Sequence, residues 1–230
     1  MKMIKKFYKH HWQDLHFIRR LEWNIIYKWL NPKINEVICD MGCGEGFYSY
    51  KLAKKGCKLY GIDLDKRAIG SALKFFRHFN NHFELGNAEA LPYKSNFFDK
   101  AFSICTLEHI RNDQKALKEV FRVLKKGGIF VLSVDSSSYG TTSKIKELDK
   151  KRYSTLRFYQ IKDLEEKLKK ANFKIENTKF ILNSPISAFF YRLAIKLNFK
   201  LPSTILFPLS YPLSKISDRL FGKKDKGIIL

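Results

Sequence analysis

The residues with the clearest chemical potential form a short glycine-rich stretch. Asp40-Met41-Gly42-Cys43-Gly44-Glu45-Gly46 directly follows an apolar run and precedes a helical pattern. Glycine lets the backbone turn tightly and approach a ligand closely, and the first turn of a helix favours an anionic group. A dinucleotide fingerprint that began at Gly42 would need its third glycine where Phe47 stands. The alternating glycines therefore predict a ligand-binding turn of a different type.

Polar side chains follow the next two predicted strands. Asp63 ends the apolar run Lys58–Asp63, where a carboxylate can accept hydrogen bonds from two neighbouring ribose hydroxyls. Asp65 is expected to cap the helix that comes next. Asn87 lies in Gly86–Tyr93, after the third strand, and its amide oxygen can accept a hydrogen bond. These positions predict a nucleoside-binding edge of a sheet.

The elements that must position these residues alternate along the chain. Strands are expected at 36–40, 58–63, 82–85, 100–105 and 128–135, with helices at 47–55, 66–79 and 114–124. Such alternation predicts an α/β fold in which helices cover both faces of a doubly wound, mostly parallel sheet. Ligands bind such sheets at the carboxyl ends of the strands.

Further elements flank this core. We expect a helix over Phe7–Leu30, a helix over Ile161–Lys170 that ends with Asn172 in the left-handed conformation, and a strand over Phe173–Phe180. The expected organisation is an N-terminal helical cap (1–36), a core (37–182), a basic amphipathic helical addition (183–226) and a remnant of a last strand (227–230).

The order of these motifs resembles class I S-adenosylmethionine-dependent methyltransferases over about Val37 to Thr178. The D-x-G-x-G-x-G loop, the acid after the second strand, Gly86–Tyr93 and Leu124–Val131 follow the order of that family. Asn87 stands where the family usually has Asp, and Lys126 replaces a proline. Arg157–Tyr159 and Ala171–Phe173 resemble a degraded later motif of the small-molecule branch, which contains ubiquinone and menaquinone biosynthesis methyltransferases.

The resemblance implies a Rossmann-like methyltransferase fold and S-adenosyl-L-methionine as the cofactor. It places the following residues at the cofactor: Asp40, Gly42, Cys43, Gly44, Gly46, Asp63, Leu64, Asn87, Ala88 and Cys105. No metal is expected, because the spacing of the four cysteines matches no zinc pattern and no disulfide framework.

Two residues after the later strands are candidate general bases, His109 and Asp135. A base is needed only where the acceptor keeps its proton. His109 could equally hydrogen-bond within its loop, and Asp135 could only cap a turn; Tyr139 and Tyr153 are further options. Ser103–Leu107 lacks the N-P-P-Y type motif of enzymes that methylate nucleobase amines. Cys105 follows Ile104 rather than proline, which favours a buried strand cysteine over a nucleophile.

The formal net charge of +22 predicts attraction to anions, either nucleic acid or an acidic membrane face, although a lysine-rich composition alone could also produce it. In 183–226, apolar residues at helical spacing accompany Arg192, Lys196 and Lys200, followed by the proline-broken run Leu201–Leu213. This pattern is typical of an interfacial membrane segment and equally of a packed lid over the acceptor. The run is too short for a spanning helix, and no signal peptide is expected after the basic Met1–Lys9.

The sequence therefore predicts a cytoplasmic methyltransferase for a small or lipid-like acceptor, such as a quinone, prenyl or glycolipid intermediate. Peripheral contact with the inner face of an anionic membrane is part of this hypothesis. The alternatives are an RNA-modifying or nucleic-acid-binding protein of the same fold, favoured by charge alone, and a cofactor-binding protein without transferase activity. Any nucleic-acid binding is expected to be nonspecific.

Overall fold

The chain forms two compact units, which are described separately. The computed structural model describes residues 17–79, 81–136, 147, 154–196, 203–221 and 228–229. The core unit comprises 26–133 and 164–175, and the second unit comprises the described parts of 1–25, 134–163 and 176–230.

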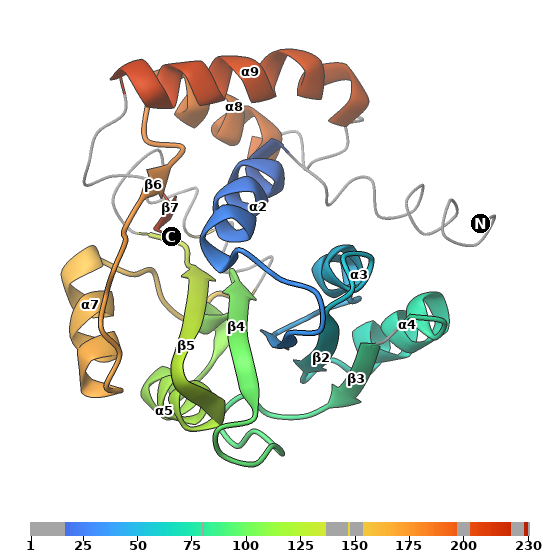
Figure 1. Cartoon of the computed structure of the whole chain (residues 1–230). Coiled ribbons are helices and arrows are strands. Elements are labelled where there is room, and N and C mark those ends of the chain that lie inside the picture. The colour runs from blue at the N-terminus through green and yellow to red at the C-terminus, as the bar shows by residue number, and fades with distance from the viewer. Residues whose placement is uncertain are drawn as a thin grey trace. The chain divides into compact units, whose positions relative to one another are not determined.

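The core unit contains a five-stranded sheet in the order β3-β2-β1-β4-β5, and every neighbouring pair of strands is parallel (Figure 1). Its strands are β1 (Val37–Met41), β2 (Lys58–Asp63), β3 (Asn81–Leu85), β4 (Phe98–Ile104) and β5 (Leu124–Ser133). The chain runs outward from β1 to β3 and then returns to the other side of β1. The carboxyl ends of β1 and β4 therefore flank the reversal of strand order at which such sheets bind ligands. The predicted doubly wound parallel fold is confirmed.

Helices connect the strands, as the alternating pattern predicts. They are α3 (Phe47–Ala53), α4 (Lys66–Phe76), the short 3₁₀ helix η1 (Leu107–His109) and α5 (Asp113–Val123). The α4 helix buries Ile69, Ala72 and Phe76, which recur at helical spacing. Asp65 caps α4, since its side chain accepts hydrogen bonds from the backbone N–H groups of the first turn. This cap was predicted from the sequence.

The elements that follow the sheet agree only in part with those predicted from the sequence. Helix α7 spans Ile161–Lys170 as expected, and Asn172 has a φ of 67° in the left-handed region. The strand expected over Phe173–Phe180 is wrong, because only Phe180–Ile181 forms a strand, β6. The Phe173 ring packs against Phe121 and Phe130 without strand pairing.

The second unit is mainly helical. The α2 helix (Phe17–Leu30) begins in it, and it contains α8 (Pro185–Lys196), α9 (Ser203–Phe221) and β7 (Ile228–Ile229). The last strand expected at 227–230 is present as β7, which pairs antiparallel with β6. The expected break of Leu201–Leu213 by proline is wrong, because α9 continues through Pro208 and Pro212. Asp218 helps to hold α9, since its carboxylate accepts hydrogen bonds from Ser184 and Ser187.

Some expectations fall outside the described residues. They concern Phe7–His16 of the expected first helix, Tyr139, Tyr153, Lys200 and the side chain of Lys196. Among the described helices, none has the length and apolar character that crossing a bilayer requires.

Candidate cofactor and acceptor site

The glycine-rich loop after β1 has a conformation that favours glycine. Gly42, Gly44 and Gly46 have φ angles of 76°, 52° and 77°, and Gly46 precedes the first turn of α3. A Cβ at Gly42 would lie 2.2 Å from the Thr106 Cγ2, whereas a Cβ at Gly44 would meet no atom within 4 Å. Gly42 is therefore required by internal packing. Gly44 borders open space, as expected where a backbone approaches a ligand.

Hydrogen bonds fasten this loop to the end of β2. The Gly42 and Cys43 N–H groups donate to the Ile62 carbonyl at 2.8 and 3.1 Å. The Gly44 N–H donates to Asp63 Oδ2 at 2.8 Å, and the Asp65 N–H donates to Asp63 Oδ1 at 2.9 Å. Asp63 therefore holds the loop in place, a role that the sequence did not reveal. A carboxylate has about four acceptor positions, so both oxygens can still accept ligand hydroxyls.

Asp40 lies at the base of the loop and is buried, with its Oδ2 accepting a hydrogen bond from the Ser49 Oγ at 2.8 Å. Burial raises the pKa of Asp40 to about 7, the Ser49 hydrogen bond opposes this rise, and the negative charge of Asp63 adds to it. Cys43 is also buried, which raises the pKa of its thiol above the ordinary value. Both side chains therefore lie inside the protein and support the loop rather than face solvent.

Leu64 and Asn87 follow β2 and β3 at the same edge of the sheet. Leu64 is 73% exposed. A flat apolar ligand bound beside the turn would cover this side chain, and its burial would be favourable. Asn87 is exposed, and its Oδ1 accepts a hydrogen bond from the Glu89 N–H at 2.9 Å. Ala88 is half-buried in the same turn. The Asn87 amide oxygen closes the turn, so its predicted contact with adenine would use its second lone pair and stays a prediction.

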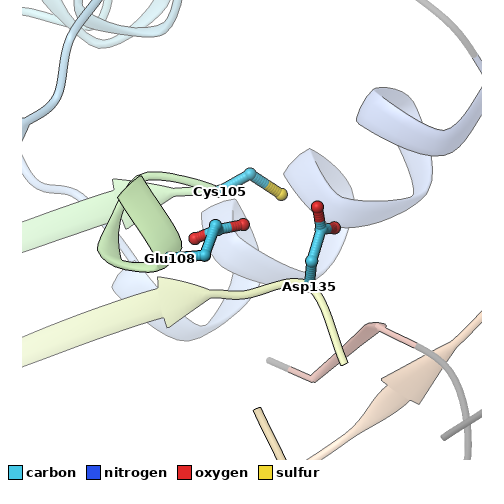
Figure 2. A group of neighbouring side chains, drawn as sticks. All are labelled: Cys105, Glu108 and Asp135. Atoms are coloured by element: carbon cyan, nitrogen blue, oxygen red, sulfur yellow. The ribbon is translucent and has the colours of Figure 1, made fainter. Parts of the chain in front are cut away.

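The turn after β4 carries Cys105, Glu108 and His109. Cys105 lies one residue beyond the strand with a φ of 46°, and its N–H donates to the Ser133 carbonyl at 3.0 Å. Glu108 is fully buried, and its carboxylate lies within 4.8 Å of the Cys105 Sγ (Figure 2). The burial of Glu108 was not predicted from the sequence, because an acidic residue next to a histidine carries no pattern that indicates burial.

The candidate bases fall in different units. His109 is half-buried on η1 in the core unit. Asp135, also labelled in Figure 2, follows β5 in the second unit, where its carbonyl accepts a hydrogen bond from the Tyr159 N–H at 2.9 Å. The roles of both residues in catalysis stay predictions.

The loop, the acid at the end of β2 and the parallel sheet form a nucleoside-binding architecture. A model of the methyltransferase domain family matches residues 32–179. The chain belongs to this family. It is an S-adenosylmethionine-dependent methyltransferase, and the open space at Gly44, the Asp63 acceptor and the exposed Leu64 fit that cofactor.

Known proteins resemble this methyltransferase to different extents. An uncharacterized protein of Methanocaldococcus jannaschii is 32% identical over 206 residues, which cover 78% of each chain. The ubiquinone/menaquinone biosynthesis C-methyltransferase of Zymomonas mobilis is 38% identical over 112 residues, 44% of this chain and 43% of that protein. This chain thus matches less than half of that enzyme's length.

A solved structure supports the fold. Phosphoethanolamine N-methyltransferase 2 of Haemonchus contortus, in complex with S-adenosyl-L-methionine, superimposes with a TM-score of 0.67 at 17% identity, covering 91% of this chain and 51% of that chain. At this level of identity, the likeness concerns the fold of the methyltransferase alone.

Proposed function

We propose that this methyltransferase acts on a small, lipid-like acceptor such as a quinone, prenyl or glycolipid intermediate. The observation that carries the proposal is its 38% identity over 112 residues to a quinone-biosynthesis C-methyltransferase. The segment after β4 supports it, because Ser103–Leu107 lacks the motif of enzymes that methylate nucleobase amines.

The core unit offers groups for each part of the cofactor. Asp63 would accept hydrogen bonds from the ribose hydroxyls with the lone pairs that Gly44 and Asp65 leave open. The exposed Leu64 would cover one face of the adenine, and Asn87 would accept from its amino group. The methionine part would lie along the open side of Gly44.

The remaining predicted residues support this binding surface. Asp40, Gly42, Cys43 and Gly46 fix the shape of the loop, while Ala88 and Cys105 lie in the turns after β3 and β4. When bound, S-adenosylmethionine supplies an electrophilic methyl group on a positively charged sulfur. The chain's own contribution would be mainly positioning and exclusion of water.

A base is required where the acceptor atom keeps its proton at working pH. We propose His109 for this role, with Asp135 as the second candidate. Glu108 is adjacent to His109 on the same turn and fully buried. A carboxylate in this position could orient an imidazole or stabilise its protonated form.

Transfer of a labelled methyl group tests the proposal. The purified enzyme is incubated with methyl-labelled S-adenosylmethionine and, separately, with lipid extract, aqueous metabolite extract and RNA. Label is expected in the lipid fraction, and Gly44→Val should abolish it because the side chain fills the open space beside the loop. Label in RNA would favour the nucleic-acid-modifying alternative, which rests on the net charge of +22. Label in the aqueous fraction alone would refute a lipid-like acceptor.

A further inference from the structure

Helix α9 has an inverted distribution of polar and apolar residues. Ser210, Ser214 and Ser217 are buried on one side of the helix, each with at most 1% of its surface exposed. On a neighbouring face, about 100° around the helix, large apolar side chains are exposed, and they recur at helical spacing: Leu209, Leu213, Ile216 and Leu220. A water-facing helix normally has the reverse arrangement.

Helix α8 packs beside α9 (Figure 1). Its buried positions include the small residues Ser187 and Ala188, while Ile186 and Phe189 are exposed. Small residues on the inner sides of paired helices allow their backbones to approach closely, as in helices that face lipid. We call the exposed apolar residues of α9 the outer apolar face: Leu209, Leu213, Ile216 and Leu220.

A half-buried carboxylate fixes the rotation of α9. Asp218 Oδ1 accepts hydrogen bonds from the Ser184 Oγ at 2.7 Å and the Ser187 Oγ at 2.6 Å, and its Oδ2 accepts from the Leu182 N–H at 2.7 Å. These bonds hold Asp218 toward the start of α8. The leucines of α9 are therefore directed outward by a specific contact.

The charges on the two helices have a corresponding asymmetry. Lys215 and Arg219 are exposed on α9 next to the outer apolar face, and Arg192 is half-exposed on α8. Asp218 is the one acidic residue in the sequences of α8 and α9, and its carboxylate is engaged with α8. The exposed charge on α8 and α9 is therefore positive. An anionic surface complements these two helices better than an uncharged one does.

We propose that the outer apolar face, together with Lys215 and Arg219, docks the enzyme on an anionic lipid bilayer. The apolar side chains would enter the boundary between headgroups and acyl chains, while the cations contact anionic headgroups. A second copy of the chain is a poorer occupant, because a symmetric contact would bring like charges together. The inference goes beyond methyl transfer and needs no acceptor.

Vesicle co-sedimentation of the full chain tests this docking. One set of vesicles is pure phosphatidylcholine, and the other contains equal parts of phosphatidylcholine and phosphatidylglycerol. The enzyme should bind the second set far more strongly, with a loss of about fivefold for each of Lys215→Gln and Arg219→Gln. Ile216→Glu combined with Leu220→Glu should abolish binding.

The matched control is Leu73→Glu, since Leu73 is an exposed leucine on a helix of the core unit. It should bind vesicles like the wild type. All variants should retain the thermal melting curve of the wild type, which shows that they fold. Light scattering of the free enzyme tests the alternative that a second copy of the chain covers this face. Absence of binding to the anionic vesicles, a wild-type level of binding in the double variant, or a dimer that Ile216→Glu dissociates would overturn the proposal.

Discussion

Two neighbouring glycines should respond differently to the same substitution. Gly42 and Gly44 both have positive φ angles, so alanine at either position carries the strain of the left-handed region, about 1–2 kcal/mol. They differ in what a new methyl group would contact. At Gly42 the methyl would lie 2.2–2.7 Å from atoms of the Thr106 side chain, and at Gly44 it would enter open space.

The contact with Thr106 sets the expected difference in stability. Overpacking of this kind typically costs about 1–3 kcal/mol, so Gly42→Ala should lower the free energy of unfolding by about 2–5 kcal/mol in total. Gly44→Ala should lower it by about 1–2 kcal/mol. The Gly44 N–H would still donate to Asp63 in the alanine variant, so the loop itself should keep its shape.

Cofactor binding should distinguish the two positions in the opposite way. The methyl of Gly44→Ala would occupy the space assigned to the cofactor, so the affinity for S-adenosylhomocysteine should fall by about 5- to 150-fold, equivalent to about 1–3 kcal/mol. The folded fraction of Gly42→Ala should lose less affinity, because its methyl faces the protein interior.

Thermal or urea denaturation and titration calorimetry measure these quantities on the same samples. Equal losses of stability in the two variants would contradict the packing argument at Gly42. Wild-type affinity in Gly44→Ala would show that the space beside Gly44 is not part of the cofactor site. Because each variant is the other's control, the strain common to both cancels from the comparison.

Variants at three further residues test other contacts. Asp63→Ala should weaken S-adenosylhomocysteine binding by about 1.5–3 kcal/mol, and Asp63→Asn by less, since the amide oxygen still accepts one hydrogen bond; unchanged calorimetry in Asp63→Ala would contradict the ribose assignment. The pKa of Asp40 is about 7 when folded against an ordinary 3.8, so between these values the folded state retains a proton that the unfolded state has lost. This group therefore lowers stability as pH rises from about 4 to about 7, and Asp40→Asn should flatten that part of a denaturation series; an unchanged slope would contradict the shift. Ser214→Ala should leave stability unchanged or raise it by up to about 1 kcal/mol, because within the described residues its buried hydroxyl has no hydrogen-bond partner, whereas Ser214→Leu should lower melting temperature by overpacking.

The core unit could be predicted well because its signals are local. Strand and helix patterns alternate within short distances, and the spacing of Gly42, Gly44 and Gly46 marks the turn directly. Asp65 could be recognised as a cap, since capping depends on a few successive residues. The double hydrogen bond of Asp63 could not be predicted, because it joins the loop after β1 to the end of β2.

Elements whose form depends on distant partners were predicted less well. Phe173–Phe180 contains the apolar residues Phe173, Ile175 and Phe180. A strand also needs a neighbour with which to pair, and only Phe180 and Ile181 have one in the described part of the chain. In the same way, Glu108 gave no signal because its burial results from the fold around η1.

The orientation of α9 gives the strongest example, because periodicity shows that a helix has two faces without showing which one is buried. Rotating α9 to bury its leucines would remove Asp218 from the Leu182 and Ser184 N–H groups. Leaving such buried donors without acceptors costs about 1–3 kcal/mol each. Burying a leucine or isoleucine fully contributes about 1.5–3 kcal/mol, but the four apolar side chains of α9 are only 37–64% exposed, so each would gain about half of that. Asp218 also accepts hydrogen bonds from the Ser184 and Ser187 hydroxyls, so the hydrogen bonds that rotation would break and the apolar burial that it would add are of similar size. The contacts of Asp218 therefore decide which side of α9 is buried, and a bilayer could cover the exposed side chains without breaking them.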